Sequence, residues 1–265
     1  MTSSSTYLGI DIGGTKTAVS ISCPQRGILE KTRFETDPDH GPKQAIEKII
    51  ACGQRLSQRN KDHRAVTGVG ISVGAMFNPE DGRFGEAPHL PGWTNFPLVS
   101  EIEKAFELPV AADNDANACA LAEWKFGTGQ GLRHLAFLTF GTGLGAGLIL
   151  NGQLYGGSCN LAGEIGAVRV AADGPPVRDK PGCLEGFASG AGIAGLVERA
   201  LADPQGASSP CLIRGASARD VAVGARAGDP LCLEIFAEAG TRLGQGLSIL
   251  LDLLNLEMIL LGSIF

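Results

Sequence analysis

The sequence has no run of basic residues and no apolar stretch long enough to cross a membrane. Its 22 Lys and Arg are outnumbered by 28 Asp and Glu, so the net charge is −6. This balance disfavours binding to nucleic acid and attraction to a membrane surface. The first six residues are polar and lack the apolar core of a signal peptide. We therefore expect no nucleic-acid partner and no membrane association.

The sequence also lacks paired cysteines. It has seven, an odd number, and no two of them form a Cys-x-x-Cys pair. Scattered cysteines of this kind favour free thiols over a disulfide framework, and free thiols are typical of the cytoplasm. We therefore expect a cytoplasmic protein.

Glycine, in contrast, is abundant, with 38 of 265 residues, which is about double its ordinary usage. The hydrophobic content of 44% and the charged content of 19% are typical of a globular enzyme. The chain is long enough for two lobes. The excess glycine is concentrated in turns, which suits a protein whose backbone lines several binding loops.

One glycine turn lies in residues 11–17 (DIGGTKT), directly after the apolar run at 7–10. A Rossmann or P-loop turn would open a helix, but residues 17–22 alternate polar and apolar side chains and predict a strand. Glycines can take positive φ there, and the backbone N–H groups of such a turn can bind a phosphate. Asp11, at the end of the first strand, is expected to approach a phosphate-bound Mg²⁺ through water.

A second glycine turn lies in residues 141–147 (GTGLGAG). An apolar run at 134–140 precedes it, and two short runs joined by Asn-Gly follow, which is a strong hairpin signal. One such turn alone can be a purely structural hairpin. Two turns between strands, one in each half of the chain, favour a pair of phosphate-binding turns.

The remaining pattern predicts strands, then helices, in each half. Residues 78–97 are expected to be a loop, and an Asp or Asn is expected to cap the helix that begins near residue 115. Gly228-Asp229-Pro230 predicts a stop, an N-cap and a first-turn proline. The predicted strands are 27–34, 65–73, 110–112, 134–140, 146–150, 153–155 and 258–265, and the predicted helices begin near 42, 98, 115, 192, 217 and 230.

Taken in order, several motifs resemble the ROK family of sugar kinases and repressors, within the actin-like and hexokinase-like ATPase superfamily. They are residues 11–17, 114–118 (NDANA), 141–147, 162–166 (AGEIG) and 182–190 (GCLEGFASG). The resemblance implies an α/β chain with the two-lobed actin-like ATPase (ribonuclease H-like) fold and duplicated βββαβα units. The lobes would be residues 1–114 and 115–265, the second ending short of the family's adenosine-contacting turn and following helix.

The resemblance also implies an ATP-dependent sugar kinase that phosphorylates a hydroxyl of a hexose or N-acetylhexosamine, with Mg²⁺ beside ATP. Asp115 would be the catalytic base, because such transfers need positioning, charge neutralisation and an acceptor for one proton. A purely capping role is the alternative for Asp115, and a solvated loop charge is the alternative for Glu164. The sugar contacts would be Asn114, Glu164 and Glu185. The ATP contacts would be Asp11, Gly13, Gly14, Thr15, Lys16, Thr142, Gly143 and Gly262.

The chain departs from the family pattern at its zinc ligands. The family has a histidine after Gly-Glu-Ile-Gly and a following cysteine cluster, but here Ala167, Pro176 and Arg178 stand at ligand positions. Only Cys183 remains, and one thiol cannot build a tetrahedral zinc site. We therefore expect no structural zinc, a loop at 175–181 held by its prolines and packing, and altered sugar contact near the anomeric end.

Two rival functions follow from the same resemblance. A non-catalytic sugar-sensing or regulatory protein is favoured by the missing zinc ligands. A repressor needs a DNA-binding helix-turn-helix, which the six polar residues before the first strand cannot supply. The sugar, the phosphoryl donor and the oligomeric state, a homodimer included, are left open.

Overall fold

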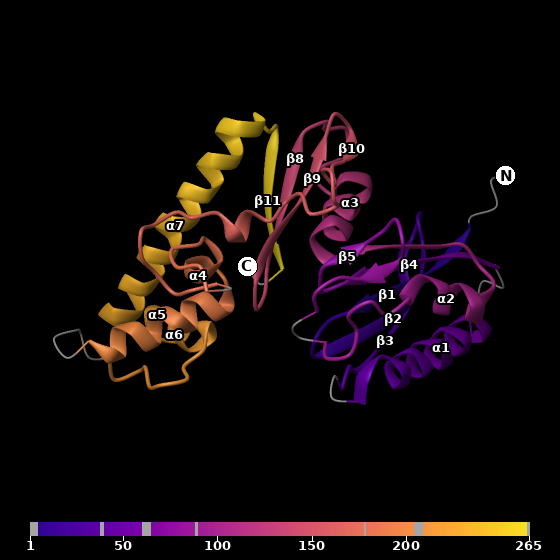
Figure 1. The fold of residues 1–265 in the computed structure, drawn as a ribbon, viewed down its shortest axis with the longest axis horizontal. Coiled ribbons are helices and arrows are strands. Elements are labelled where there is room, and N and C mark those ends of the chain that lie inside the picture. Colours follow the sequence, from indigo (N-terminus) through magenta and orange to yellow (C-terminus); the bar gives the residue numbers. More distant parts are fainter. Residues whose placement is uncertain are drawn as a thin grey trace. The chain divides into compact units, whose positions relative to one another are not determined.

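The computed structural model describes residues 5–263, apart from 38–39, 60–64, 88–89, 178 and 204–208. The chain divides into two compact units, Met1–Ala118 and Cys119–Phe265 (Figure 1). Both units combine sheet and helix, so the predicted α/β class is confirmed. No helix among the described residues is long and apolar enough to cross a bilayer.

The first unit is built on a five-stranded sheet in the order β3-β2-β1-β4-β7. The first three strands form an antiparallel meander, and β4 and β7 are parallel to β1 and to each other. This is the predicted order of three strands, helix, strand, helix and strand. The strands are β1 (Thr6–Ile12), β2 (Lys16–Cys23), β3 (Gly27–Glu35), β4 (Val66–Val73) and β7 (Val110–Asn114).

Two helices, α1 (Gly41–Arg59) and α2 (Leu98–Phe106), pack into the core of this sheet. Helix α1 buries Ile46, Ile49 and Leu56, whose spacing of three and seven places them on one helix face. These side chains join the buried residues of β1 and β4 in one cluster. The core therefore lies beneath the strands whose carboxyl ends carry Asp11 and Asn114.

The stretch predicted as a loop at 78–97 contains a small hairpin, so that prediction was wrong in part. Strands β5 (Phe77–Asn78) and β6 (Arg83–Phe84) pair antiparallel. Phe84 then stacks edge-on against Trp93, with 5.0 Å between the ring centroids, and Trp93 is fully buried. Aromatic packing therefore fixes this stretch together with turn-type backbone hydrogen bonds, such as the bond from the Asn95 N–H to the Phe84 carbonyl at 2.9 Å.

The second unit has a four-stranded sheet in the order β10-β9-β8-β11. Strands β8 and β9 form a hairpin, and the terminal strand β11 runs parallel to β8. The sequence thus continues as three strands, helices and a strand up to residue 263. The strands are β8 (Leu135–Phe140), β9 (Leu144–Leu150), β10 (Gln153–Leu154) and β11 (Met258–Ser263).

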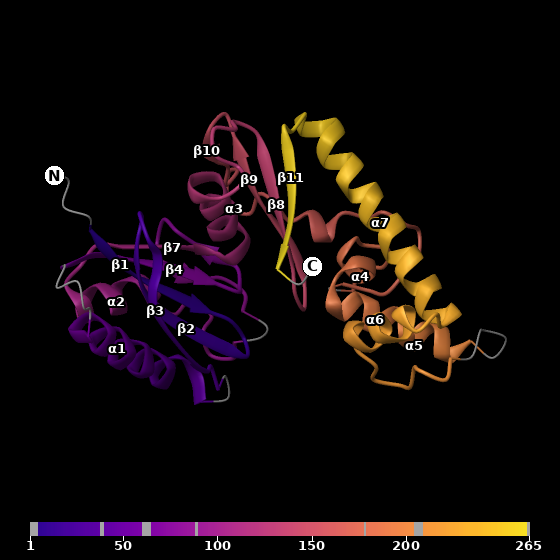
Figure 2. The ribbon, with the colours of Figure 1, turned by 180° about the vertical axis from the view of Figure 1, so that it is seen from behind.

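Helix α7 contacts α4, α5 and α6, and at its end the chain turns into β11 (Figure 2). Its start matches the prediction, because the Asp229 side chain accepts from the Cys232 N–H at 3.0 Å and a proline occupies the first turn. Helix α3 begins in the first unit and ends in the second. The helices are α3 (Asp115–Phe126), η2 (Ile165–Ala167), α4 (Glu185–Ala188), α5 (Gly190–Ala202), α6 (Ala218–Arg226) and α7 (Pro230–Leu254).

Candidate active site

The first glycine turn, residues 13–15, joins β1 to β2. The Gly13 N–H donates to the Lys16 carbonyl at 3.0 Å, and the Thr36 hydroxyl donates to the Gly13 carbonyl at 2.6 Å. The N–H groups of Gly14 and Thr15 have no hydrogen-bond acceptor within the described part of the chain. Two donors in one tight turn can hold an anion such as a phosphate.

Positive φ does not explain the glycines of the two turns, contrary to the expectation from sequence. Neither Gly13 nor Gly143 has a positive φ. Space is the constraint, because a Cβ on Gly13 would lie 3.1 Å from the Lys16 carbonyl oxygen. A side chain there would press on the bond that shapes the turn.

The exposed side chains of Asp11 and Lys16 flank this turn at the ends of β1 and β2. Asp11 is paired with Ala18 across the hairpin and with Ser72 across the parallel pair β1–β4. Asp11 is therefore an exposed residue one position before the carboxyl end of β1, close in sequence to the turn. Thr36, which the sequence did not single out, is buried and closes the other side of the turn.

The junction of β7 and α3 carries Asn114 and Asp115. The Asn114 Oδ1 accepts from the Asn117 N–H at 2.8 Å, which caps the first turn of the helix. The Asp115 Oδ1 accepts from the N–H of the next residue, Ala116, also at 2.8 Å. Asp113 is held in turn by Asn117, whose Nδ2 donates to the Asp113 Oδ1 at 2.9 Å. Both side chains thus accept from N–H groups of the first turn of α3, and the role of Asp115 as the catalytic base stays a prediction.

Gly74 lies between the first turn and Asp115. A Cβ on Gly74 would lie 3.7 Å from the Gly13 Cα and 4.0 Å from the Asp115 Oδ2. Its N–H donates to the Ile12 carbonyl at 2.8 Å, which holds β4 against the turn. Gly74 is absent from the predicted set, although a glycine that ends a buried strand signals a close approach. The first unit thus brings the phosphate-type turn and the Asp115 carboxylate to one place.

The second glycine turn, residues 141–143, is also closed by a hydrogen bond from its first N–H, although across one residue fewer than the first turn. The Gly141 N–H donates to the Gly143 carbonyl at 3.0 Å. Helix α5 holds the turn from behind, because the N–H groups of Gly190 and Ala191 donate to the carbonyls of Gly141 and Thr142 at 2.9 and 3.3 Å. As in the first turn, two N–H groups, those of Thr142 and Gly143, find no acceptor among the residues described.

Glu185, at the start of α4, lies directly on this second turn. Its Oε2 accepts from the Leu144 N–H at 2.8 Å, and a Cβ on Gly143 would lie 2.8 Å from the same oxygen. Gly166 packs on the other side, where a Cβ would lie 3.2 Å from the Glu185 Cβ. Glu185 therefore contacts the second turn, although it lies on another segment of the sequence.

Glu164 is exposed at the N-terminus of η2. The Ala167 N–H donates to its carbonyl at 3.1 Å, whereas its carboxylate has no partner in the described residues. The preceding Gly163 has φ of 93°, and a Cβ there would collide with the Ala146 carbonyl, so only glycine fits. A solvated charge and a ligand contact both remain compatible with the position of Glu164.

Gly262 lies within strand β11 and not in a turn. It is paired with Thr139 of β8, so it is close to the carboxyl end of the strand that leads into the second turn. A Cβ on Gly262 would collide with the Phe137 ring. Close packing on Phe137 therefore explains this glycine without a ligand.

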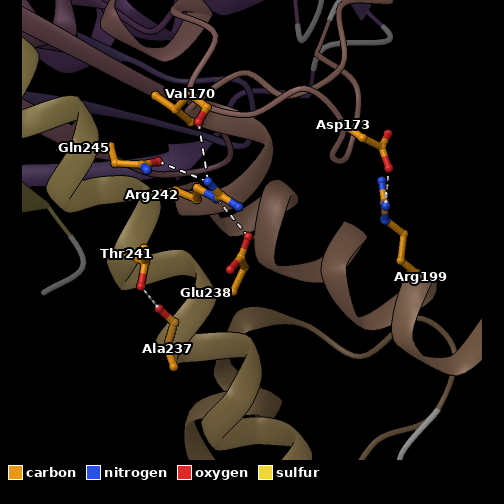
Figure 3. Close-up of polar contacts among 8 residues, drawn as sticks. All are labelled: Val170, Asp173, Arg199, Ala237, Glu238, Thr241, Arg242 and Gln245. Atoms are coloured by element: carbon orange, nitrogen blue, oxygen red, sulfur yellow. Dashed lines mark hydrogen bonds and ion pairs between the residues drawn. The ribbon is translucent and has the colours of Figure 1, made fainter.

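The loop at 168–183, where the family places its zinc cluster, is held by polar contacts as well as by packing. The Arg242 Nη1 donates to the Val170 carbonyl at 3.4 Å, and Arg199 pairs with Asp173 at 2.7 Å (Figure 3). The hydrogen bond from Arg199 lowers the pKa of the Asp173 carboxyl. Of the prolines predicted to hold residues 175–181, Pro175 is buried, Pro181 is partly buried and Pro176 is exposed.

No group of three or more His, Cys, Asp and Glu within the described residues could hold a metal ion. Of the predicted ligand positions, Ala167 and Pro176 are exposed, and Arg178 lies outside the described residues. Cys183 is a buried free thiol whose Sγ donates to the Ala167 carbonyl at 3.4 Å.

The family model described as "ROK family" matches residues 7–264. A glucokinase from Halalkalibacterium halodurans is 32% identical over 97% of this chain and 79% of its own length. A xylose repressor from Caldicellulosiruptor bescii is 31% identical over 76% of this chain and 51% of its own length.

A solved structure of the same family is similar to this chain. The crystal structure of a ROK family glucokinase from Streptomyces griseus, in complex with glucose and AMPPNP, is 31% identical. Its TM-score is 0.77, with 97% of this chain and 82% of that chain covered. This likeness confirms the predicted actin-like ATPase fold.

Proposed function

The chain belongs to the ROK family, and from this premise we propose that it is an ATP-dependent sugar kinase. The observation that carries the proposal is the repeated turn. Each unit has a glycine turn closed by its own first N–H, with two further N–H groups that have no acceptor among the described residues. One turn lies beside the Asp115 carboxylate, and the other is bonded to Glu185.

The proposed reaction needs a proton acceptor, groups that bind the phosphates and groups that bind the sugar. We propose that Asp115 accepts the proton of the sugar hydroxyl as that oxygen attacks the γ-phosphate of ATP. The N–H groups of the two turns would hold the phosphates, where positioning and charge neutralisation supply most of the rate. Asn114, Glu164 and Glu185 would bind the sugar hydroxyls, since amides and carboxylates offer the acceptors that a polyol needs.

A magnesium ion fits the residues beside the first turn. Mg²⁺ prefers oxygen ligands and is commonly held by one or two carboxylates together with substrate phosphates. The Asp11 carboxylate and the Thr15 hydroxyl are exposed there and meet that description. Bound Mg²⁺ would neutralise charge on the phosphates, whereas no residue set that could hold a zinc ion is found in the described residues.

We propose a hexose or an N-acetylhexosamine as the acceptor. The Streptomyces griseus glucokinase was solved in complex with glucose, which supports a hexose as the acceptor. Position 167 carries only a methyl group, so a polar side-chain contact is missing there. We therefore expect broader tolerance at the anomeric end of the sugar than a histidine at this position would allow.

A coupled ADP-release assay tests the proposal. Purified protein with ATP and Mg²⁺ would be offered glucose, mannose, N-acetylglucosamine and N-acetylmannosamine in turn. We expect ADP release that depends on one or more of these sugars and disappears in Asp115→Asn. Sugar-independent ADP release, or none with any sugar, would contradict the kinase.

The second candidate is a non-catalytic sugar-sensing protein. The likeness to a xylose repressor favours it, as do Ala167, Pro176 and Arg178 at the positions where the resemblance predicts zinc ligands. Calorimetry separates the two, because a sensor would bind sugar without binding AMPPNP. None of the seven cysteines, all of which lie among the described residues, forms a disulfide, which supports the further proposal of a cytoplasmic location. Whether the protein forms a homodimer would be read from its mass in solution.

A further inference from the structure

The segments that carry Glu164 and Glu185 are joined by a short antiparallel ladder. Residues 168–170 run beside residues 182–184, and two backbone hydrogen bonds of 2.8 and 2.9 Å link them. These bonds run from Val170 to Gly182 and from Leu184 to Val168. Glu164 precedes one side of the ladder through η2, and Glu185 follows the other side directly. The ladder therefore sets the spacing of the two carboxylates.

The end of η2 is closed by a lysine from the loop between the two sides. The Lys180 Nζ donates to the Ala167 carbonyl at 2.8 Å, and the Cys183 thiol donates to the same oxygen. Carbonyls at a helix end lack helical partners, and a cation is favourable there. No acidic side chain among the described residues pairs with Lys180. Lys180 is exposed, and among the described residues the carbonyl of Ala167 is the acceptor for its ammonium group.

The backbone of Lys180 is itself held by hydrogen bonds. Val177 and Lys180 exchange two backbone hydrogen bonds, of 3.0 and 2.9 Å, across the tip of the loop. The rest of the loop is anchored independently by Arg242 on the Val170 carbonyl and by the Asp173–Arg199 ion pair (Figure 3). Loss of the lysine should therefore release η2 without releasing the whole loop.

A movement of η2 would displace the Glu185 side chain directly, because the two are in contact. Gly166 lies in the middle of η2, and a Cβ on it would lie 3.3 Å from the Glu185 Oε2 and would collide with the Leu144 carbonyl. The η2 turn thus packs on the Glu185 side chain with no intervening group. A shift of a few tenths of an ångström would change where that carboxylate lies.

We propose that Lys180 is a positioning residue that fixes Glu164 and Glu185 for sugar binding. Its ammonium holds the end of η2 to the ladder, at the position where the family resemblance places a metal-ligating side chain. The proposal rests on the proposed function, because it assigns the two carboxylates to the sugar. It adds that a side chain outside their segments controls sugar affinity.

The test compares Lys180→Met with Lys180→Arg and with Lys43→Met, a control at an exposed lysine of α1. Loss of one hydrogen bond should raise the KM for sugar roughly three- to tenfold in Lys180→Met. The kcat should stay within about twofold, and the KM for ATP should rise less than the KM for sugar, because only Glu185 and not Glu164 contacts the phosphate turn. Lys180→Arg should recover part of the sugar affinity. Lys43→Met should match the wild type.

Calorimetric titration with sugar alone keeps the outcomes separate. If the wild type binds sugar but releases no ADP, the kinase fails while the Lys180 comparison still stands on the measured Kd. A Lys180→Met variant with unchanged sugar Kd overturns the proposal, as does one whose only change is a lower melting temperature. Equal loss of sugar and nucleotide affinity would also overturn it, and a wild type that binds no sugar overturns both proposals.

Discussion

The Oε2 of Glu185 accepts a hydrogen bond of 2.8 Å from the N–H of Leu144, across 41 residues of sequence. This bond ties the helix predicted to hold the sugar to the turn predicted to hold phosphate. The same oxygen lies against Gly143 and Gly166. Substitutions at this place should therefore change the binding of both ligands, which gives the first two predictions.

Glu185→Ala should weaken both sugar and AMPPNP binding. It removes a carboxylate from the sugar site and leaves the Leu144 N–H without its acceptor, so the turn loses a support worth about 1.5–3 kcal/mol. Sugar affinity should fall about 10- to 100-fold. Glu185→Gln is the matched control, because its amide oxygen can still accept from Leu144. It should weaken sugar binding while AMPPNP affinity stays near the wild type. Calorimetry measures the affinity of each variant for both ligands. Unchanged AMPPNP binding in Glu185→Ala would contradict the coupling between the sugar site and the second turn.

Gly143→Ala should be harmful and Gly141→Ala harmless. A Cβ on Gly143 would lie 2.8 Å from the Glu185 carboxylate oxygen, whereas a Cβ on Gly141 would meet nothing within 4 Å. The added methyl group should displace Glu185 at a cost of about 1 kcal/mol, the low end for overpacking because a side-chain end can move. We expect about a fivefold loss of affinity for both sugar and AMPPNP in the first variant. Equal affinities in the two variants would count against the geometry.

Asp115→Asn should abolish turnover and leave the fold intact. An amide can still accept from the Ala116 N–H, and the helix keeps its cap because Asn114 supplies it. Loss of a general base typically lowers the rate by ~10²–10⁴-fold. We expect sugar affinity within about threefold of the wild type, measured by calorimetry beside an ADP-release assay. Wild-type turnover would show that Asp115 is not the base.

The effect of Glu257→Gln should depend on pH. The Glu257 carboxylate accepts from the N–H groups of Arg133 and His134 at 2.7 and 2.8 Å, and these bonds lower its pKa. A lowered pKa stabilises the fold above the ordinary carboxyl pKa of about 4 and loses that effect as pH falls through the folded-state pKa. Glu257→Gln should therefore lower the melting temperature at pH 7, and its difference from the wild type should shrink as the pH is lowered toward 3.

The control for this comparison is Glu234→Gln, at an exposed position of α7. It should melt with the wild type at both pH values, since no hydrogen bond holds that carboxylate in the described residues. A difference between Glu257→Gln and wild type that persists unchanged at pH 3 would assign the effect to packing and not to the charge.

The strands around both glycine turns were predictable because the signal is local. Alternating or apolar runs before and after the glycines specify strand–turn–strand in either half, and the structure has both hairpins. The reason for the glycines was not predictable, since room beside Lys16 and Glu185 depends on how segments meet. The same limit hid Gly74, Thr36 and Lys180, whose partners are far along the chain or are backbone atoms.

Gly13 and Gly141 each donate their N–H to a carbonyl at the far end of their own turn. The shape of both turns is therefore set by bonds within the chain. A phosphate that binds there would not have to order a loose segment, so little conformational entropy would be lost on association. The association rate of the nucleotide should then be set by diffusional encounter and electrostatic attraction. No slow loop-folding step is expected in the approach to equilibrium.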